Sequence, residues 1–530
     1  MSTSKKILIV AACGLLSGWF NVLQSMNKGA SSKRSRSSSS LLRQPVLRSS
    51  ESEVEGSVGQ ASGTQAISFD TLLQNSNNFL ATMNWRAFHT YDNTINGFMS
   101  RNNTGVLKTI VQDKICSNAN NVSVIVHPKV MTLINDFLAL KKTSGSSVEQ
   151  ELYANMTPNA FIDRLLKNRP LAFLGRDDYY LLRDGQTQGD GGNFEAIGTE
   201  NEQAPLILRD YLSYDEMPIS ALLGVVVPTH FINSGSRVNK GIFDASGNYE
   251  RHGIYVGQVG ARFERPEQME YAHMFITAQQ NTAANGYGPN DPNPSDPRHR
   301  LLRIWSKFYG VPYFPLAAKG AIRGGLNKEI FKKRMRMVIE PFLIEANNRA
   351  AAKNKKAYVI ATGLGLSAWL VAQEQKDILM QVYAEVLTNR TFSNISDLHF
   401  PHFTLKGSYN PTQRDPAQST QEYRDLLTKT VYSGMKHGVP FTINGNHIMI
   451  HYDLRDAAEE LTGDDAGKLL IAQYAWDGNA YPGNEYWEGS LAASGDPAAA
   501  CCSMIPELQN PLINPNVSSK TLHVLPAPAR

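Results

Sequence analysis

The most constraining feature of the chain is a pattern of strand, turn and helix in its last third. Residues 356–361 (KAYVIA) form a short apolar run typical of a buried strand, and residues 362–367 (TGLGLS) form a glycine-bearing turn. Residues 368–387 then repeat apolar side chains at helical spacing. Apolar runs at 122–128 and 469–475 also predict buried strands. Strands that alternate with helices predict an α/β fold, with helices packed against a sheet.

The composition allows a large core and argues against a nucleic-acid partner. The 530 residues are 42% hydrophobic, and 52 Lys and Arg against 48 Asp and Glu give a net charge of only +4. A basic surface that binds nucleic acid normally skews this balance further. The four cysteines, Cys13, Cys116, Cys501 and Cys502, form neither a disulfide framework nor a paired CxxC motif. We expect buried structural thiols.

The first 65 residues differ from the rest of the chain. Lys5 and Lys6 precede an apolar run over residues 7–23, which is typical of a signal peptide or a short membrane anchor. The serine- and arginine-rich sequence that follows lacks the apolar residues that would offset chain ordering, so we expect disorder. This segment predicts a secreted or membrane-anchored protein.

We divide the chain into three parts. Residues 1–65 form the leader and linker, residues 66–165 a helical N-terminal extension, and residues 166–530 the α/β domain. The extension is predicted from apolar side chains three to four residues apart at 69–88 and 130–142.

The turn at 362–367 predicts a phosphate site. Glycine permits positive φ and a close approach of backbone to ligand. A helix N-terminus offers unpaired N–H groups and a partial positive charge. The spacing matches neither the dinucleotide fingerprint nor the P-loop, and a tight turn that merely needs small residues is an equal alternative. The residues predicted to bind a diphosphate are Gly363, Leu364, Gly365, Leu366 and Ser367.

The loop at 476–496 carries the candidate chemistry. It holds three acidic residues, Asp477, Glu485 and Asp496, eight and eleven residues apart. Since it follows an apolar strand, we expect it at the carboxyl end of that strand, where open α/β sheets bind ligands. Asp496 before proline and alanines is also a good helix cap. For Asp496 alone we favour the cap, and for the loop as a unit we favour function.

The same loop offers groups suited to a sugar. Asparagine amides can exchange hydrogen bonds with ribose hydroxyls, and aromatic rings offer flat faces. The residues predicted to bind ligand here are Asn479, Gly483 and Asn484. The neighbouring aromatic residues are Trp476, Tyr481, Tyr486 and Trp487.

Four stretches resemble the MavL-like family of macrodomain-like proteins, typified by a secreted bacterial effector. The resemblance runs over roughly residues 165–515 and implies a macrodomain-like mixed sheet flanked by helices. The order of the two loops departs from ordinary macrodomains, in which the ribose loop precedes the diphosphate loop. The similar stretches are LSYDEMPISALLGVVVPTHFINSGSRVNKG (212–241), VGARFERPEQMEY (259–271), YVIATGLGLSAWLVAQEQ (358–375) and YAWDGNAYPGNEYWEGSLAASGDPAAACCSMIPELQNPLIN (474–514).

The resemblance also implies an activity. It suggests an ADP-ribose pocket and a hydrolase that removes ADP-ribose from a modified protein such as ubiquitin, without a cofactor. An effector of this type would be delivered into a host cell. Asp477, Glu485 and Asp496 match the acidic cluster of the family, although an aspartate is expected where Glu485 stands. An ADP-ribosyl bond is glycosidic, so one carboxylate could activate water while a protonated partner assists the leaving group.

Two other functions remain open from the sequence. A module that binds ADP-ribose without cleaving it needs the diphosphate turn but not three carboxylates. A metal-dependent hydrolase would need side chains that converge on an ion, although histidines four apart suit zinc best on a helix and these lie on a predicted strand. We therefore predict no metal in the site. The candidate ligands for that alternative are His399, His402, His447, His451 and Asp453.

Several other charged residues have two interpretations. Arg262 and Glu264 either shape the pocket or form a cross-strand salt bridge. Glu202 and the run at 213–216 could line the pocket. The basic run at 332–336 is expected to be a solvated helix face.

Overall fold

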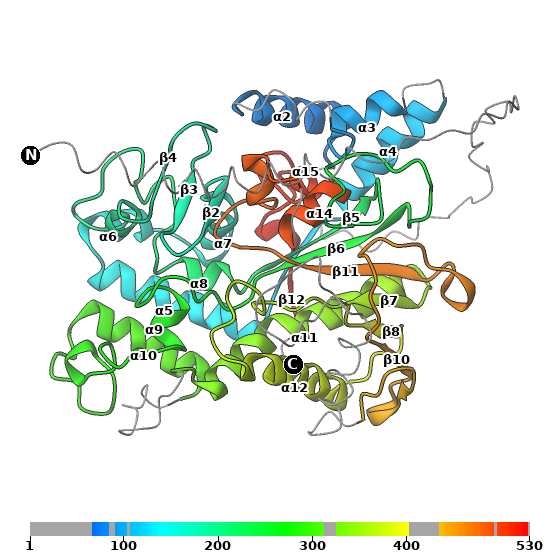
Figure 1. The fold of residues 1–530 in the computed structure, drawn as a ribbon. Helices are drawn as coiled ribbons and strands as arrows, with labels where there is room; N and C mark the ends of the chain where they lie inside the picture. Colours follow the sequence, from blue (N-terminus) through cyan, green and yellow to red (C-terminus); the bar gives the residue numbers. More distant parts are fainter. Residues whose placement is uncertain are drawn as a thin grey trace, which may run out of the picture. The chain divides into compact units, whose positions relative to one another are not determined.

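One nine-stranded mixed sheet organises the fold (Figure 1). The computed structural model describes residues 66–83, 91–102, 106–311, 325–401, 434–491 and 495–527. From one edge of the sheet to the other, the strands are β12 (Leu522–Val524), β1 (Ser123–Val126), β5 (Gly224–His230), β6 (His252–Gln258), β11 (Leu469–Ala475), β7 (Ala357–Ile360), β8 (Ile395–His399), β10 (Ile448–His451) and β9 (Pro440–Phe441).

Five adjacent strands run in one direction. β6, β11, β7, β8 and β10 pair in parallel, whereas β5 is antiparallel to β6 and β9 is antiparallel to β10. The carboxyl ends of the five parallel strands therefore meet along one side of the sheet, which we call the carboxyl edge. In open α/β sheets ligands bind at this edge.

Helices cover both faces of the sheet. Figure 1 shows α11 and α12 together on one face, with α2, α3, α4, α14 and α15 on the other. A smaller three-stranded sheet consists of β2 (Ala172–Leu174), β3 (Tyr179–Leu181) and β4 (Gln188–Gly189). The described helices are α2 (Phe69–Ala81), α3 (Ile95–Arg101), α4 (Val106–Asn120), α5 (Pro128–Ser144), α6 (Ser147–Tyr153), α7 (Pro158–Lys167), α8 (Met217–Ser220), α9 (Glu270–His273), α10 (Pro297–Tyr309), α11 (Lys328–Ala352), α12 (Glu374–Asn389), α14 (Asp496–Cys502) and α15 (Ile505–Leu508).

The central strand β11 packs on both of these layers. Successive side chains of a strand point to opposite faces. Gln473 accordingly accepts a hydrogen bond from Tyr383 of α12, and the next residue, Tyr474, donates to Gln509 just after α15. All seven residues of β11 except Ala475 are buried. A strand enclosed on both faces holds its following loop in a fixed place.

The structure confirms the predicted α/β class, with a mixed sheet flanked by helices. The predicted strand at 122–128 is β1, which lies inside the sheet between β12 and β5. Residues 66–165 therefore contribute to the core as well as forming helices. The helix predicted at 368–387 begins later than expected, because α12 starts only at Glu374.

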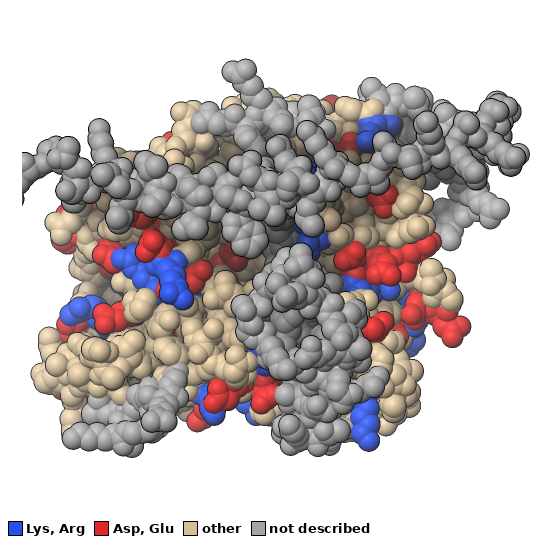
Figure 2. Space-filling view, in the orientation of Figure 1, with Lys and Arg blue, Asp and Glu red and all other residues tan. Residues whose placement is uncertain are grey.

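The basic run at 332–336 is only partly a solvated face. Arg334 is 1% exposed, and its guanidinium donates to the carbonyls of Val259 and Gly260 at 3.1 and 3.3 Å. On the face that Figure 2 shows, Lys and Arg side chains are interspersed with Asp and Glu side chains. The leader and the proposed anchor at 7–23 lie outside the described residues. Within the described ranges, no helix is long and apolar enough to cross a membrane.

Candidate active site

The acidic loop lies at the carboxyl edge, between two other loops. β11 ends at Ala475, and Asp477 follows two residues later. The strands on either side of β11 are β6 and β7, so the loops at 259–269 and 361–373 leave the same edge beside it. The acidic loop thus lies at the carboxyl end of its strand, as predicted, and the turn at 362–367 leaves the same edge.

Asp496 is not a helix cap. It is the first residue of α14, and Gly495 occupies the cap position without a side-chain cap. Its carboxylate instead accepts hydrogen bonds from the main-chain N–H groups of Gly483 and Asn484, at 2.9 and 2.8 Å. The capping interpretation of Asp496 is therefore wrong. The carboxylate thus links the start of α14 to the acidic loop.

Asn484 joins two of the carboxylates. Its main-chain N–H donates to Asp496, and its side-chain amide donates to Asp477. Its side-chain oxygen accepts a 2.7 Å hydrogen bond from the main-chain N–H of Phe173 in β2. Asn484 is fully buried. Its side chain thus fixes the Asp477 carboxylate against the small sheet.

The pKa values of all three carboxyl groups are raised, and those of Asp477 and Glu485 differ. Burial raises the pKa of Asp477 to about 6, while the hydrogen bond from Asn484 opposes this rise. Burial, followed by the charges of Asp477 and Asp496, raises the pKa of Glu485 to about 9. Burial and the charge of Asp477 also raise the pKa of Asp496. Near pH 7.5 Glu485 is therefore protonated and Asp477 is mostly ionised, which separates a proton donor from a proton acceptor.

A buried arginine stands beside this cluster. Arg262, in the loop after β6, is 2% exposed and forms salt bridges with Glu264 and, at 2.8 Å, with Asp178. The hydroxyl of Tyr214 donates to the other Asp178 oxygen at 2.6 Å. The charge of Arg262 lowers the pKa of Asp477, which burial raises overall. Arg262 therefore both forms a salt bridge and favours the ionised form of Asp477.

The turn after β7 packs tightly against the loop after β6. Gly365 has a φ of +71°, and a Cβ atom on Gly260 would lie 2.4 Å from the nitrogen of Gly365. Only glycine fits at this crossing of two backbones. Gly363 is partly exposed and Ser367 is exposed, whereas Leu364 and Leu366 are buried. The exposed side of the turn is thus formed by Gly363 and Ser367.

This turn does not lead directly into a helix. Residues 368–373 are irregular, and the side-chain oxygen of Gln375 accepts from the N–H groups of Val371 and Ala372, at 2.8 and 2.9 Å. The prediction that the turn forms the start of a helix is wrong, because α12 begins only at Glu374. Any ligand at the turn would bind to loop backbone instead of a helix N-terminus.

The aromatic residues of the acidic loop are structural. Each of them is at most 3% exposed, so none offers an open face for stacking. The amide of Asn479 donates to the sulfur of Met269 at 3.3 Å, and Asn479 is likewise buried. The buried rings are Trp476, Tyr481, Tyr486 and Trp487.

The other acidic candidates serve the scaffold. Glu202 accepts from the main-chain N–H groups of Gly198 and Leu208, at 3.0 and 2.8 Å. In the run at 213–216, Asp215 pairs with Lys141 and Glu216 pairs with Arg164. These contacts tie the run to α5 and α7. They connect it to the N-terminal segment and not to the acidic loop.

Two of the candidate metal-binding histidines are engaged in hydrogen bonds with their neighbours. His451 bonds to Asp397 at 2.9 Å, and His399 bonds to Tyr358 and to the main-chain oxygen of Asp453, each at 2.8 Å. His447 is exposed, and His402 lies outside the described residues. In the part of the chain that the structure describes, no three His, Cys, Asp or Glu side chains could hold a metal ion.

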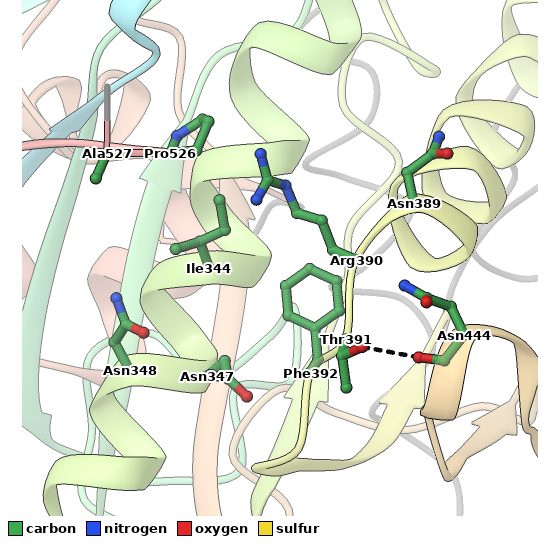
Figure 3. Close-up of a pocket in the computed structure, with 10 residues that line it drawn as sticks. All are labelled: Ile344, Asn347, Asn348, Asn389, Arg390, Thr391, Phe392, Asn444, Pro526 and Ala527. Atoms are coloured by element: carbon green, nitrogen blue, oxygen red, sulfur yellow. Dashed lines mark hydrogen bonds between the residues drawn. The ribbon is translucent and has the colours of Figure 1, made fainter. Parts of the chain in front are cut away.

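An open pocket of about 470 Å³ lies elsewhere (Figure 3). It is near the end of α12 and the start of β8, and hence at the opposite edge of the sheet from the carboxylates. Polar side chains dominate its lining. The lining residues are Ile344, Asn347, Asn348, Asn389, Arg390, Thr391, Phe392, Asn444, Pro526 and Ala527.

The fold and the site together define an α/β protein with clustered carboxylates at the carboxyl edge of its sheet. The chain belongs to the MavL-like ADP-ribosylhydrolase family, whose model matches residues 99–528. It is 35% identical over 429 residues to a Drosophila melanogaster protein named ADP-ribosylarginine hydrolase CG3568, covering 78% of this chain and 79% of that protein. It is 34% identical over 410 residues to ADP-ribosylarginine hydrolase CG2909 of the same organism, covering 74% and 76%. These similarities support ADP-ribose hydrolysis as the general activity.

Proposed function

We propose that this protein hydrolyses the bond between ADP-ribose and an arginine side chain of a modified protein. The observation that carries the proposal is the grouping of the three acidic residues at the carboxyl edge: Asn484 donates hydrogen bonds to Asp477 and Asp496, and Glu485 is the next residue in the chain. The names of the two relatives supply the arginine linkage.

The proposed reaction uses the two protonation states. The bond between ribose C1 and the guanidinium nitrogen breaks through an oxocarbenium-like state, and the guanidine that leaves takes the proton of Glu485. Asp477 accepts a proton from the water that attacks C1, so the products are ADP-ribose and an intact arginine. Asp496, which is held by two main-chain N–H groups, orients the loop that carries Glu485.

We place the diphosphate near Gly363 and Ser367, on the exposed side of the turn. The turn and the acidic loop follow adjacent parallel strands, so they lie side by side at the sheet edge. A carboxylate would repel a diphosphate. The ribose end therefore belongs beside the carboxylates and the diphosphate beside the turn. Asn479, Gly483 and Asn484 would then contribute to the ribose end mainly by shaping the loop.

The test is release of ADP-ribose from proteins modified on a single type of side chain. We expect the full chain to release ADP-ribose from an arginine-modified protein, including arginine-modified ubiquitin, and not from a serine-modified one. Release from serine alone would contradict the proposed linkage. Binding of ADP-ribose by calorimetry without release from any substrate would favour a binding module.

A further inference from the structure

A segment near the N-terminus packs directly behind the acidic loop. The ring of Phe79 in α2 makes edge contacts with Tyr481 and Trp487, with ring centroids 6.1 and 5.3 Å apart. Phe79 is 7% exposed. The two partners lie on either side of Asn484 and Glu485 in the sequence. The apolar face of α2 therefore supports the part of the loop that carries the proposed proton donor.

One asparagine joins the two elements that carry carboxylates. The side-chain amide of Asn93 donates to the carbonyl of Ala500 at 2.7 Å and to the hydroxyl of Tyr486 at 3.1 Å. Ala500 lies in α14, which begins with Asp496, and Tyr486 follows Glu485 in the short 3₁₀ helix η6 (Glu485–Glu488). Asn93 is 1% exposed. Both bonds are therefore shielded from water.

A buried carboxyl group ties the same segment to the domain. Glu507 in α15 accepts from the main-chain N–H of Ile95 at 2.6 Å and from the hydroxyl of Ser76. Ser76 belongs to α2, and Ile95 begins α3. Asn93 is therefore held between two anchored helices, and its position relative to α14 is fixed.

We infer that Asn93 is a positioning residue, which sets the separation of Glu485 and Asp496 by holding η6 to α14. The inference rests on the proposed function, because it assigns these carboxyl groups to catalysis. The family match begins at residue 99, so Asn93 and α2 lie before the matched region. Asn93 does not touch the carboxyl groups; it acts through the elements on which they stand.

The test compares Asn93→Ala with a matched control, Asn96→Ala. Asn96 stands one turn further along in α3 and bonds to Asn77 of α2 at 2.6 Å, away from the acidic loop. A third variant, Asn93→Leu, keeps the branched outline of the side chain, fills the site that alanine would leave empty, and removes the hydrogen bonds. All three are made in the full chain.

Two measurements separate positioning from general stability. In steady-state kinetics on an arginine-modified protein, Asn93→Ala and Asn93→Leu should lower kcat at least tenfold and change KM less than threefold. In hydrogen exchange, the backbone amides of residues 483–488 should exchange at least tenfold faster in both variants. Asn96→Ala should leave kcat, KM and this exchange unchanged.

The outcomes distinguish a failure of the proposed function from a failure of the positioning role of Asn93. If the native chain has no activity on any modified protein, the proposed function is wrong, and the exchange measurement still tests the link between η6 and α14. Native exchange rates at 483–488 in both Asn93 variants would overturn the inference. Faster exchange with native kcat would also overturn it, since the separation would then have no catalytic effect. If Asn93→Ala does not fold, the result from Asn93→Leu decides.

Discussion

The main-chain N–H of Asn484 donates a 2.8 Å hydrogen bond to the carboxylate of Asp496. Through its side chain the same residue donates to Asp477, so one buried asparagine connects the two aspartates. Gly483 contributes a second main-chain N–H to Asp496. Main-chain N–H groups therefore hold Asp496 and a side-chain amide holds Asp477, so substitutions within the cluster should have distinct effects on activity and on stability.

Removing the Asn484 side chain should affect both properties. Asn484→Ala leaves the N–H of Phe173 without its partner and takes a hydrogen bond from Asp477. We expect a loss of unfolding free energy of about 1–3 kcal/mol. Because that hydrogen bond lowers the pKa of Asp477, the acid limb of the pH–rate profile should move to higher pH. Chemical denaturation and kcat/KM against pH are the measurements, and an unmoved acid limb would contradict the assignment of Asp477.

Replacing the proposed acid by an amide should greatly lower turnover without unfolding the protein. Burial and the neighbouring aspartates keep Glu485 protonated at neutral pH, so glutamine resembles the native neutral side chain but cannot give up a proton. Glu485→Gln should lower kcat by roughly 10²–10⁴-fold and leave ADP-ribose binding within threefold. The control is Glu151→Gln, at an exposed position in α6. Native turnover in Glu485→Gln would remove Glu485 from the mechanism.

Activity should depend on pH as a bell-shaped curve. Asp477 must be ionised to accept a proton, so activity should fall below about pH 6, the pKa to which burial raises it. Glu485 must be protonated to donate, so activity should also fall above about pH 9. The profile of kcat/KM from pH 5 to 10 reports both limits. Activity that stays constant up to pH 10 would show that Glu485 is not the donor.

The close approach of Gly365 to the loop at Gly260 and Ala261 predicts that a larger residue at 365 removes ADP-ribose binding. Gly365→Val must adopt a positive φ, and its Cβ would lie 3.2 Å from the carbonyl oxygen of Ala261. The left-handed backbone alone costs about 1–2 kcal/mol. Gly467→Ala is the matched control, because it has a φ of +81° with nothing within 4 Å. We expect calorimetry to show lost ADP-ribose binding only for Gly365→Val, and equal binding by both variants would contradict the proposed site of the diphosphate.

Glu507 should make stability depend on pH. Burial raises its pKa in the folded state to about 7, from 4.5. Between these values the folded state keeps a proton that the unfolded state loses, so unfolding free energy falls as pH rises from about 4.5 to 7. Glu507→Gln should remove this dependence of the unfolding free energy on pH. The difference in unfolding free energy between the variant and the native chain should therefore rise by about 3 kcal/mol across that range, at roughly 1.4 kcal/mol per pKa unit. Urea denaturation at pH 4.5, 6 and 8 measures it, and a constant difference would contradict the prediction.

The sequence alone determined the class of the fold and the position of the acidic loop after a buried strand. Apolar runs at 357–360 and 469–475 have the length and composition of buried strands, and such patterns depend mainly on local sequence. In open α/β sheets the loops that bind ligands follow the carboxyl ends of the strands, which indicated the side of the sheet on which Asp477 lies. Resemblance to the family, carried by long matching stretches, indicated ADP-ribose.

Only the tertiary structure decided how the carboxyl groups are held. The local sequence predicted that Asp496 caps a helix. In the structure its carboxylate instead accepts hydrogen bonds from main-chain N–H groups of the acidic loop. No spacing in the sequence connects Asn93 to α14, or Phe173 to Asn484, because these partners are hundreds of residues apart. Burial, which raises the pKa of Glu485, likewise exists only once distant segments have packed around the loop. Hydrogen bonds and desolvation at the site depend on long-range contacts, whereas the strand pattern depends on neighbours in the chain.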